Sequence, residues 1–204
     1  MTPIDTKRLH LEPVTAANAG VLWRIMQMRL LREYQDVPRY TRDDFVRRVA
    51  ARPRRFDGRA TGRFEWLVVI RATREPVGWI SLRLGEQHRG TAEIGYSIVT
   101  GYRSGGYATE AAVALIDYAF EETALRKIDA CCVPENLPSR RLLARAGFVE
   151  MRTQHNGAIV RGKPVDIVIY ELHRERWETM RSGRSGAQAS SENSIEIPAS
   201  AKGK

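Results

Sequence analysis

The feature that most constrains this chain is a cluster of small residues directly before its clearest helix, in the segment GYRSGGYATEAAVALIDYAF that begins at Gly101. From residue 108 onward, apolar residues recur at helical spacing, which predicts a helix with one side facing a core. Glycine loses more conformational freedom on folding than other residues, so three glycines here need a compensating role. A glycine-rich turn leading into a helix directs several backbone N–H groups at one point, where the helix dipole adds partial positive charge. The stretch therefore predicts a binding site for a phosphate or pyrophosphate.

This stretch differs from two familiar phosphate-binding motifs. No Gly-Lys-Ser or Gly-Lys-Thr follows it, so it is not a Walker loop, and it does not read GxGxxG. The strand expected before it belongs to a series of hairpin-spaced strands and not to a βαβ unit. On these residues alone, an ordinary glycine-rich turn remains an equal alternative.

The remaining segments predict one domain that mixes helices and strands. Strand-like apolar runs lie at residues 7–12, 64–72, 77–84, 91–99, 127–133, 148–156 and 164–177. Helical patterns lie at residues 15–31, 42–52, 108–122 and 138–146. Thr41 is expected to cap the second helix and Gly147 to end the fourth. We expect a single domain over residues 1–178 and a disordered tail over residues 179–204, which holds little apolar surface.

The charge of the chain is unevenly distributed. The formal net charge is +9, and residues 24–63 contain twelve arginines against five acidic residues. Such a segment can attract an acidic substrate, a ribosome or nucleic acid, but it can equally be a solvated helical face. No aromatic pattern typical of nucleic-acid binding accompanies it.

The other reactive side chains give few signals. Cys131 and Cys132 are adjacent in an apolar run, which favours buried strand residues in a reducing compartment. The four histidines are scattered, so we expect no metal site. No stretch approaches the roughly 20 apolar residues of a membrane helix, and a cytoplasmic location is expected.

Several short motifs occur together in one order. Arg103, Gly106 and Ala108 fit the pattern Q/R-x-x-G-x-G/A, with AEIGY before them, PEN, a serine and AGF after them, and G..VD.VIY near the end. With this set the chain resembles the GNAT superfamily of acetyl-CoA-dependent N-acetyltransferases over residues 6–177. It is most similar to the branch that includes the ribosomal-protein N-terminal acetyltransferases, which share T.RL.L.P, YATEA and VIYEL..E.W.

The resemblance implies an α/β (α+β) fold. It has a mixed central sheet of about six to seven strands, splayed in the middle and flanked by about four helices. Acetyl-CoA would lie in the splay, with Ile98 and Val99 pairing along its pantetheine arm. The backbone of one loop would hold the pyrophosphate, namely Arg103, Ser104, Gly105, Gly106, Tyr107, Ala108 and Thr109. Where the family usually has Gly then Lys or Arg, this chain has Ser104 then Gly105, so one basic side chain is missing.

The resemblance also implies catalytic residues. Glu93 is the candidate base that draws a proton from the amine, although a cross-strand pair with Arg83 is an alternative role. Asn136 and Ser139 would contact the sulfur end of the coenzyme, and Ser139 could hydrogen-bond the departing thiolate; helix capping is the alternative.

The usual acidic tyrosine of the family is absent here. Leu143 occupies its position. The general acid would then be Ser139, a water molecule or another tyrosine such as Tyr170. Tyr96 and Trp66 either line the acceptor groove or belong to the core.

Two functions are therefore considered. The first is an N-acetyltransferase that moves acetyl from acetyl-CoA to a primary amine, either a protein N-terminus or a small molecule, with an acidic acceptor favoured by the arginines. The second is a weakly catalytic CoA-binding protein that docks on ribosome or nucleic acid through its basic face. We expect no membrane partner, and both a monomer and a homodimer remain open.

Overall fold

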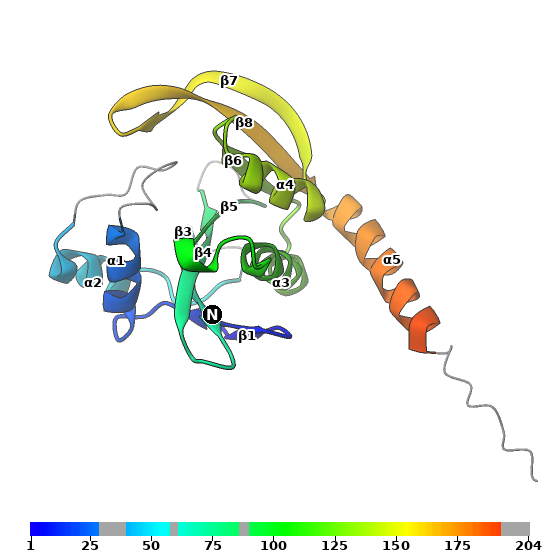
Figure 1. Cartoon of the computed structure of the whole chain (residues 1–204), viewed down its shortest axis with the longest axis horizontal. Coiled ribbons are helices and arrows are strands. Elements are labelled where there is room, and N and C mark those ends of the chain that lie inside the picture. The colour runs from blue at the N-terminus through cyan, green and yellow to red at the C-terminus, as the bar shows by residue number, and fades with distance from the viewer. Residues whose placement is uncertain (29–39, 58–60, 86–89, 193–204) are drawn as a thin grey trace, which may run out of the picture.

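The computed structural model describes residues 1–28, 40–57, 61–85 and 90–192 (Figure 1). These residues form one eight-stranded sheet in the order β1-β2-β3-β4-β5-β6-β8-β7. The strands are β1 (Ile4–Asp5), β2 (Leu9–Pro13), β3 (Gly62–Ile70), β4 (Pro76–Leu84), β5 (Thr91–Ile98), β6 (Lys127–Cys132), β7 (Val149–Val160) and β8 (Lys163–His173). The helices are α1 (Ala19–Gln27), α2 (Arg42–Ala50), α3 (Tyr107–Glu122), α4 (Leu137–Arg145) and α5 (Arg174–Glu192). The expected α/β class and mixed sheet are confirmed.

The sheet divides between β5 and β6. These two strands are parallel and pair only at their first residues, from Thr91↔Lys127 to Glu93↔Asp129. Beyond that point β5 continues to Ile98 and β6 continues to Cys132, and the two strands no longer pair with each other. A parallel pair needs a long crossover, and α3 supplies it. The splay implied by the resemblance is thus present at the centre of the sheet.

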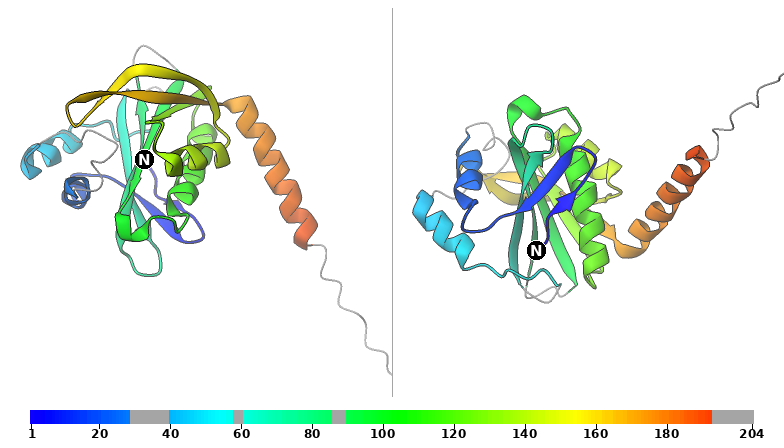
Figure 2. Two further views of the ribbon diagram at one scale, coloured as in Figure 1. Left: turned by 45° about the horizontal axis from the view of Figure 1, so that its top comes forward. Right: turned by 90° about the horizontal axis from the view of Figure 1, so that it is seen from below.

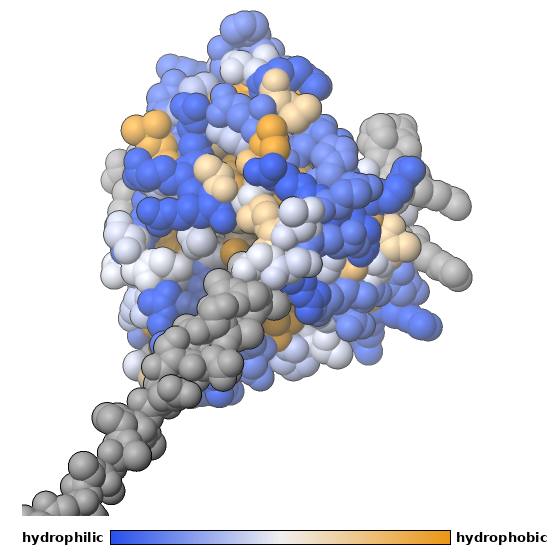
Figure 3. Space-filling model, turned by 90° about the vertical axis from the view of Figure 1, so that its right-hand side faces the viewer, coloured by the Kyte–Doolittle hydropathy of each residue, from blue (hydrophilic) through white to orange (hydrophobic). Residues whose placement is uncertain are grey.

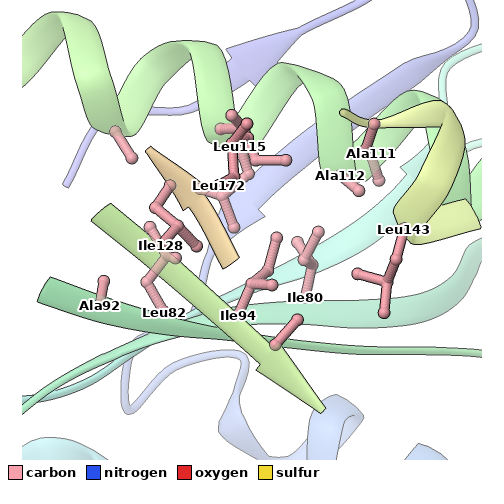
Figure 4. Close-up of a cluster of buried hydrophobic side chains, with 14 of the residues drawn as sticks. Ile80, Leu82, Ala92, Ile94, Ala111, Ala112, Leu115, Ile128, Leu143 and Leu172 are labelled. Atoms are coloured by element: carbon pink, nitrogen blue, oxygen red, sulfur yellow. The ribbon is translucent and has the colours of Figure 1, made fainter. Parts of the chain in front are cut away.

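Two apolar clusters cover the two faces of the sheet. On one face, α3 buries the side that its helical spacing predicted, with Ala112, Leu115, Ile116 and Ala119 all buried. Figure 4 shows side chains of this helix facing strand residues such as Leu82. On the other face, α1 and α2 pack on a second cluster, and Figure 2 shows these helices apart from α3 across the sheet.

Local capping agrees with the sequence. Thr41 accepts a hydrogen bond from the backbone N–H of Asp44 at 3.1 Å and starts α2. Gly147 follows α4 with φ +96°, a left-handed conformation that ends the helix. The predicted helix at residues 15–31 is shorter in the structure: α1 begins at Ala19 and ends at Gln27, with Met28 as its C-cap, and residues 29–31 lie outside the described residues.

The C-terminal segment differs from the prediction. The run at residues 164–177 leaves the sheet after His173, and the tail expected to be disordered from Thr179 continues as α5 to Glu192. Residues 193–204 lie outside the described residues. Trp177 anchors the helix. The centroid of its ring lies 5.1 Å from the centroid of the Phe120 ring, and its Nε1 donates a hydrogen bond to Asp117 at 2.6 Å. This long-range docking nucleates a helix that then extends away from the sheet (Figure 1).

The surface around this helix is mainly hydrophilic, with apolar residues scattered over it (Figure 3). Among the helices of the described ranges, none combines the length and the apolarity that a membrane crossing requires.

Candidate active site

A cavity of about 1260 Å³ lies where the sheet divides. Its wall includes residues of α1, α2, β3, β4, β5, β6, α4 and the β7–β8 hairpin, together with the loop that precedes α3. Most small-molecule sites measure roughly 300–1,000 Å³. A cavity above that range fits a site that binds two substrates together.

The loop before α3 leaves a series of backbone amides unpaired. The Arg103 N–H already donates to the Thr100 carbonyl at 3.2 Å, and Glu110 N–H makes the first bond of α3, to the Gly106 carbonyl at 3.0 Å. Among the described residues, none accepts a hydrogen bond from the N–H groups of residues 104–109. Ser104 and Gly106 have φ values of +65° and +78°, which bend the loop tightly into the helix. This geometry suits an anion at the start of α3.

Arg8, the residue before β2, contacts this loop. Its Nη1 donates to the Gly105 carbonyl at 2.9 Å, and its guanidinium lies 4.6 Å from the Tyr107 ring centroid. Its Nε also donates to Glu110 at 2.6 Å, and Thr6 donates to the same carboxylate at 2.7 Å. Burial raises the pKa of Glu110, but these hydrogen bonds outweigh it and leave the pKa lowered. Arg8 thus brings a positive charge to a loop whose sequence lacks the usual basic residue.

Ile98 and Val99 are placed differently. Ile98 lines the cavity, and its carbonyl accepts from Arg103 Nε at 3.3 Å. Val99 instead packs against the α1–α2 cluster, and its N–H donates to the Val77 carbonyl at 2.8 Å. Of the two, Ile98 is therefore the residue better placed beside a ligand in the splay.

Ser139 and Asn136 meet at the start of α4. The Asn136 side chain accepts from the Ser139 N–H at 3.2 Å, so the helix cap is Asn136 and not Ser139, for which capping was the alternative role. The Ser139 hydroxyl is 2.8 Å from the Tyr96 hydroxyl, and all three residues line the cavity. Burial raises the pKa of Tyr96, so its phenol keeps its proton at neutral pH.

The position of Glu93 is compatible with both roles considered for it, the cross-strand ion pair and the catalytic base. It lies directly opposite Arg83 in the β4–β5 register and forms an ion pair with it. It also lines the cavity on β5, close to the point where β6 diverges. The cross-strand pair is thus present, while the catalytic role stays a prediction.

Burial and cavity lining distinguish the other candidates for the general acid and for the acceptor groove. Leu143 is a core residue. The Tyr170 hydroxyl donates to Glu150 at 2.9 Å and accepts from Arg140 at 3.1 Å, away from the cavity wall. Trp66 is fully buried in the core, whereas Tyr96 lines the cavity.

The cysteines differ from the prediction that both are buried. Cys131 is exposed and Cys132 is half-buried, because both lie at the end of β6 where β5 no longer covers them. Burial raises the pKa of the Cys132 thiol, which makes it a weak nucleophile. Within the described ranges, no three His, Cys, Asp or Glu side chains gather as a metal site would require.

Two residues of this site were missed by sequence reasoning. Arg8 appeared only within the T.RL.L.P motif, and nothing local connected it to Gly105. Glu65 lines the cavity from β3, where its side chain is 1% exposed. A glutamate inside the apolar run FEWLVVI was a signal that could have identified it, because buried carboxylates in strands need a partner.

The divided sheet, the unpaired amides before α3 and the adjoining cavity form a site suited to an anionic ligand next to a second substrate. The domain described as "Acetyltransferase (GNAT) domain" matches residues 8–149, and the chain belongs to the GNAT acetyltransferase family. It is therefore an acyltransferase of the family that uses acetyl-CoA, as the resemblance implied.

Similar proteins carry related names. "Uncharacterized N-acetyltransferase p20" of Bacillus licheniformis is 26% identical over 181 residues, which are 87% of this chain and 99% of that protein. "Putative ribosomal N-acetyltransferase YdaF" of Bacillus subtilis (strain 168) is 39% identical over 101 residues, 50% of this chain and 55% of that protein. A solved structure described as RimL, a ribosomal L7/L12 alpha-N-protein acetyltransferase in complex with coenzyme A, has a TM-score of 0.74 at 17% identity. It covers 84% of this chain and 98% of its own, and at this identity it shows the shared fold alone.

Proposed function

We propose that this protein transfers an acetyl group from acetyl-CoA to a primary amine on an acidic acceptor, by direct attack in a ternary complex. The observation that carries the proposal is the continuity of one cavity from the unpaired amides of residues 104–109 to a basic region between α2 and β3. The amides supply donors for the diphosphate, and the basic region supplies a place for the acceptor.

The cofactor end follows from the loop geometry. The backbone amides of residues 104–109 bind the pyrophosphate, and Arg8 holds the Gly105 carbonyl through a hydrogen bond. The pantetheine arm lies along β5 past Ile98, where β6 has diverged and no strand competes for the space. Asn136 acts by capping α4, which fixes Ser139 at the sulfur end.

The reaction requires a proton acceptor for the amine. Glu93 takes this role, directly or through water, from its place on β5. Its ion pair with Arg83 orients the carboxylate. The neutral amine then attacks the thioester carbonyl and the C–N bond forms. The nitrogen loses its surplus proton to water, and the C–S bond breaks.

The departing thiolate needs stabilisation. Ser139 donates a hydrogen bond to the sulfur, and Tyr96 supports the Ser139 hydroxyl at 2.8 Å. The raised pKa of Tyr96 lies above the ordinary thiol pKa of about 8.5, so this pair stabilises the thiolate by hydrogen bonding without giving up its proton. The proton that completes the thiol comes from solvent or from the base.

The acceptor is acidic because of the charges on the cavity wall. The wall holds Arg48, Arg52, Arg63, Arg83, Arg103, Arg141 and Arg145 against two acidic residues, Glu65 and Glu93. Outside the cavity, arginines of the same basic segment pair with neighbouring aspartates, as Arg42 does with Asp43 and Arg47 does with Asp44. Four of the twelve arginines (29, 32, 39 and 59) lie outside the described residues. On the wall, Arg52 and Arg63 pair with Glu65 and Arg83 pairs with Glu93. The excess of arginine over glutamate among the described wall residues is what favours an acidic group there.

The test is an acceptor panel read by release of free CoA. Peptides with a free N-terminus and acidic residues at positions two to four should be the best acceptors, and their lysine-substituted counterparts should be poorer. The difference should shrink with added salt, because salt screens the arginine field. Faster turnover of spermidine or kanamycin than of every acidic peptide at low salt would contradict the acidic acceptor. The absence of any CoA release, with acetyl-CoA still bound, would contradict catalysis.

A further inference from the structure

Glu65 is a buried carboxylate with one oxygen unused. Arg52 Nη1 donates to its Oε2. The Nη1 of Arg63 is 3.7 Å from Oε1, which is too long for a hydrogen bond. Among the described residues, Oε1 has no hydrogen-bond donor. A buried carboxyl oxygen without a donor is costly, so an N–H that reaches it from the cavity would be stabilised there.

Trp79 presents the complementary group on the same face of the sheet. The residue is 3% exposed and lines the same cavity, and its indole Nε1 has no acceptor among the described residues. Glu65 is paired with Ser81 in the β3–β4 register, and Trp79 is two residues from Ser81, so both side chains leave the same face. The Cα atoms of such diagonal neighbours are about 7–8 Å apart. The site thus offers one hydrogen-bond acceptor and one donor on neighbouring positions of one face.

Small residues lie between this pair and the cavity edge at β5. The register places Glu65, Ser81 and Gly95 in one row across β3, β4 and β5. A side chain at Gly95 would approach the Ser81 hydroxyl, since an added Cβ would lie 3.2 Å from Ser81 Oγ. With strands about 4.8 Å apart, the row spans about 10 Å from β3 to β5, which is roughly three residues of extended chain.

We propose that Glu65 and Trp79 form a subsite for the main chain of a polypeptide acceptor. Glu65 Oε1 accepts from a backbone N–H, and Trp79 Nε1 donates to a backbone carbonyl, at roughly the second or third residue from the reacting α-amine. The amine itself reaches β5, next to Glu93. This deepens the proposed function and rests on it. A polyamine carries donors alone and would leave the indole N–H unpaired, so the pair selects a peptide over a polyamine.

The test compares acceptors of different length in two variants. Glu65→Gln keeps the shape, but its amide group faces the peptide N–H once Arg52 holds the oxygen. Trp79→Phe keeps a ring and removes the donor. Each variant should raise the KM for an N-terminal tripeptide about 10-fold, the expected effect of losing one such hydrogen bond. The KM for a single-residue amine and the Kd for acetyl-CoA should stay as in the wild type.

A matched control is Trp177→Phe, which also removes a buried indole N–H but lies against α3 away from the cavity. It should change neither KM. Equal changes of KM for the tripeptide and the single-residue amine would overturn the subsite. So would an unchanged KM for the tripeptide in both Glu65→Gln and Trp79→Phe. If Glu65→Gln does not fold, Trp79→Phe alone decides. If the wild type acetylates no amine at all, the proposed function fails, whereas an active wild type with unchanged variants refutes the subsite alone.

Discussion

Gly106 gives a direct test of the anion site, because its backbone conformation can be penalised without a steric clash. Its φ is +78°, and a Cβ built there would meet one atom within 4 Å, Arg8 Nη2 at 3.3 Å, the end of a flexible side chain. Alanine in the left-handed region costs about 1–2 kcal/mol. In a domain of this size that lowers the Tm by about 2–8 °C. The alanine relieves this strain by rotating its peptide planes, which turns the N–H groups of the loop away from their common point.

The effect on binding follows from the hydrogen bonds lost. A hydrogen bond to a charged group contributes about 1.5–3 kcal/mol, so losing one raises the Kd for CoA about 10- to 150-fold. Gly162, in the β7–β8 turn, is a matched control: its φ is +74°, and nothing lies within 4 Å of an added Cβ. Gly162→Ala should lower the Tm by a similar amount and leave the Kd unchanged.

The assay pairs calorimetric titration with CoA and thermal unfolding of both variants. If Gly106→Ala lost as much Tm as Gly162→Ala and still bound CoA as tightly as the wild type, the amides of this loop would not be the diphosphate site. Such a result would remove the main support for the cofactor end of the cavity.

Two further predictions concern charges at the two ends of the cavity. Arg8→Met should raise the KM for acetyl-CoA about 10-fold with little change in kcat. The variant frees the Gly105 carbonyl and leaves the Glu110 carboxylate without its arginine partner near the phosphates. Adding Glu110→Gln should recover part of the loss in the same kinetic assay. An unchanged KM would show that the Arg8–Gly105 hydrogen bond supports the fold and not cofactor binding. Glu93→Gln should lower kcat about 100-fold or more and alter its pH profile while the Kd for CoA stays constant, and an equal loss of CoA binding would instead make Glu93 structural.

Much of the local structure could be predicted from the sequence. The buried face of α3, the Thr41 cap of α2 and the glycine-rich entry to α3 each depend on residues a few positions apart. Such signals come from side-chain periodicity and from backbone conformations that few residues accept, and both are readable along the chain. The motif order added the family, and with it the splay of the sheet.

The polar environment of the site could not be predicted in the same way. Arg8 and Gly105 are 97 residues apart in sequence, and their contact exists because β2 begins beside the start of α3. Glu65 and Trp79 share a face because of the β3–β4 register, and α5 forms where Trp177 docks on Phe120.

The sequence by itself determined most of the helices and strands before α5 and indicated which backbone amides are left free for an anion, since these depend on interactions within one or two turns of chain. The tertiary structure alone decided which charges face the cavity and which buried polar atoms stay unpaired. Strand order and register set those distances, and they follow from packing the whole sheet between its two layers of helices.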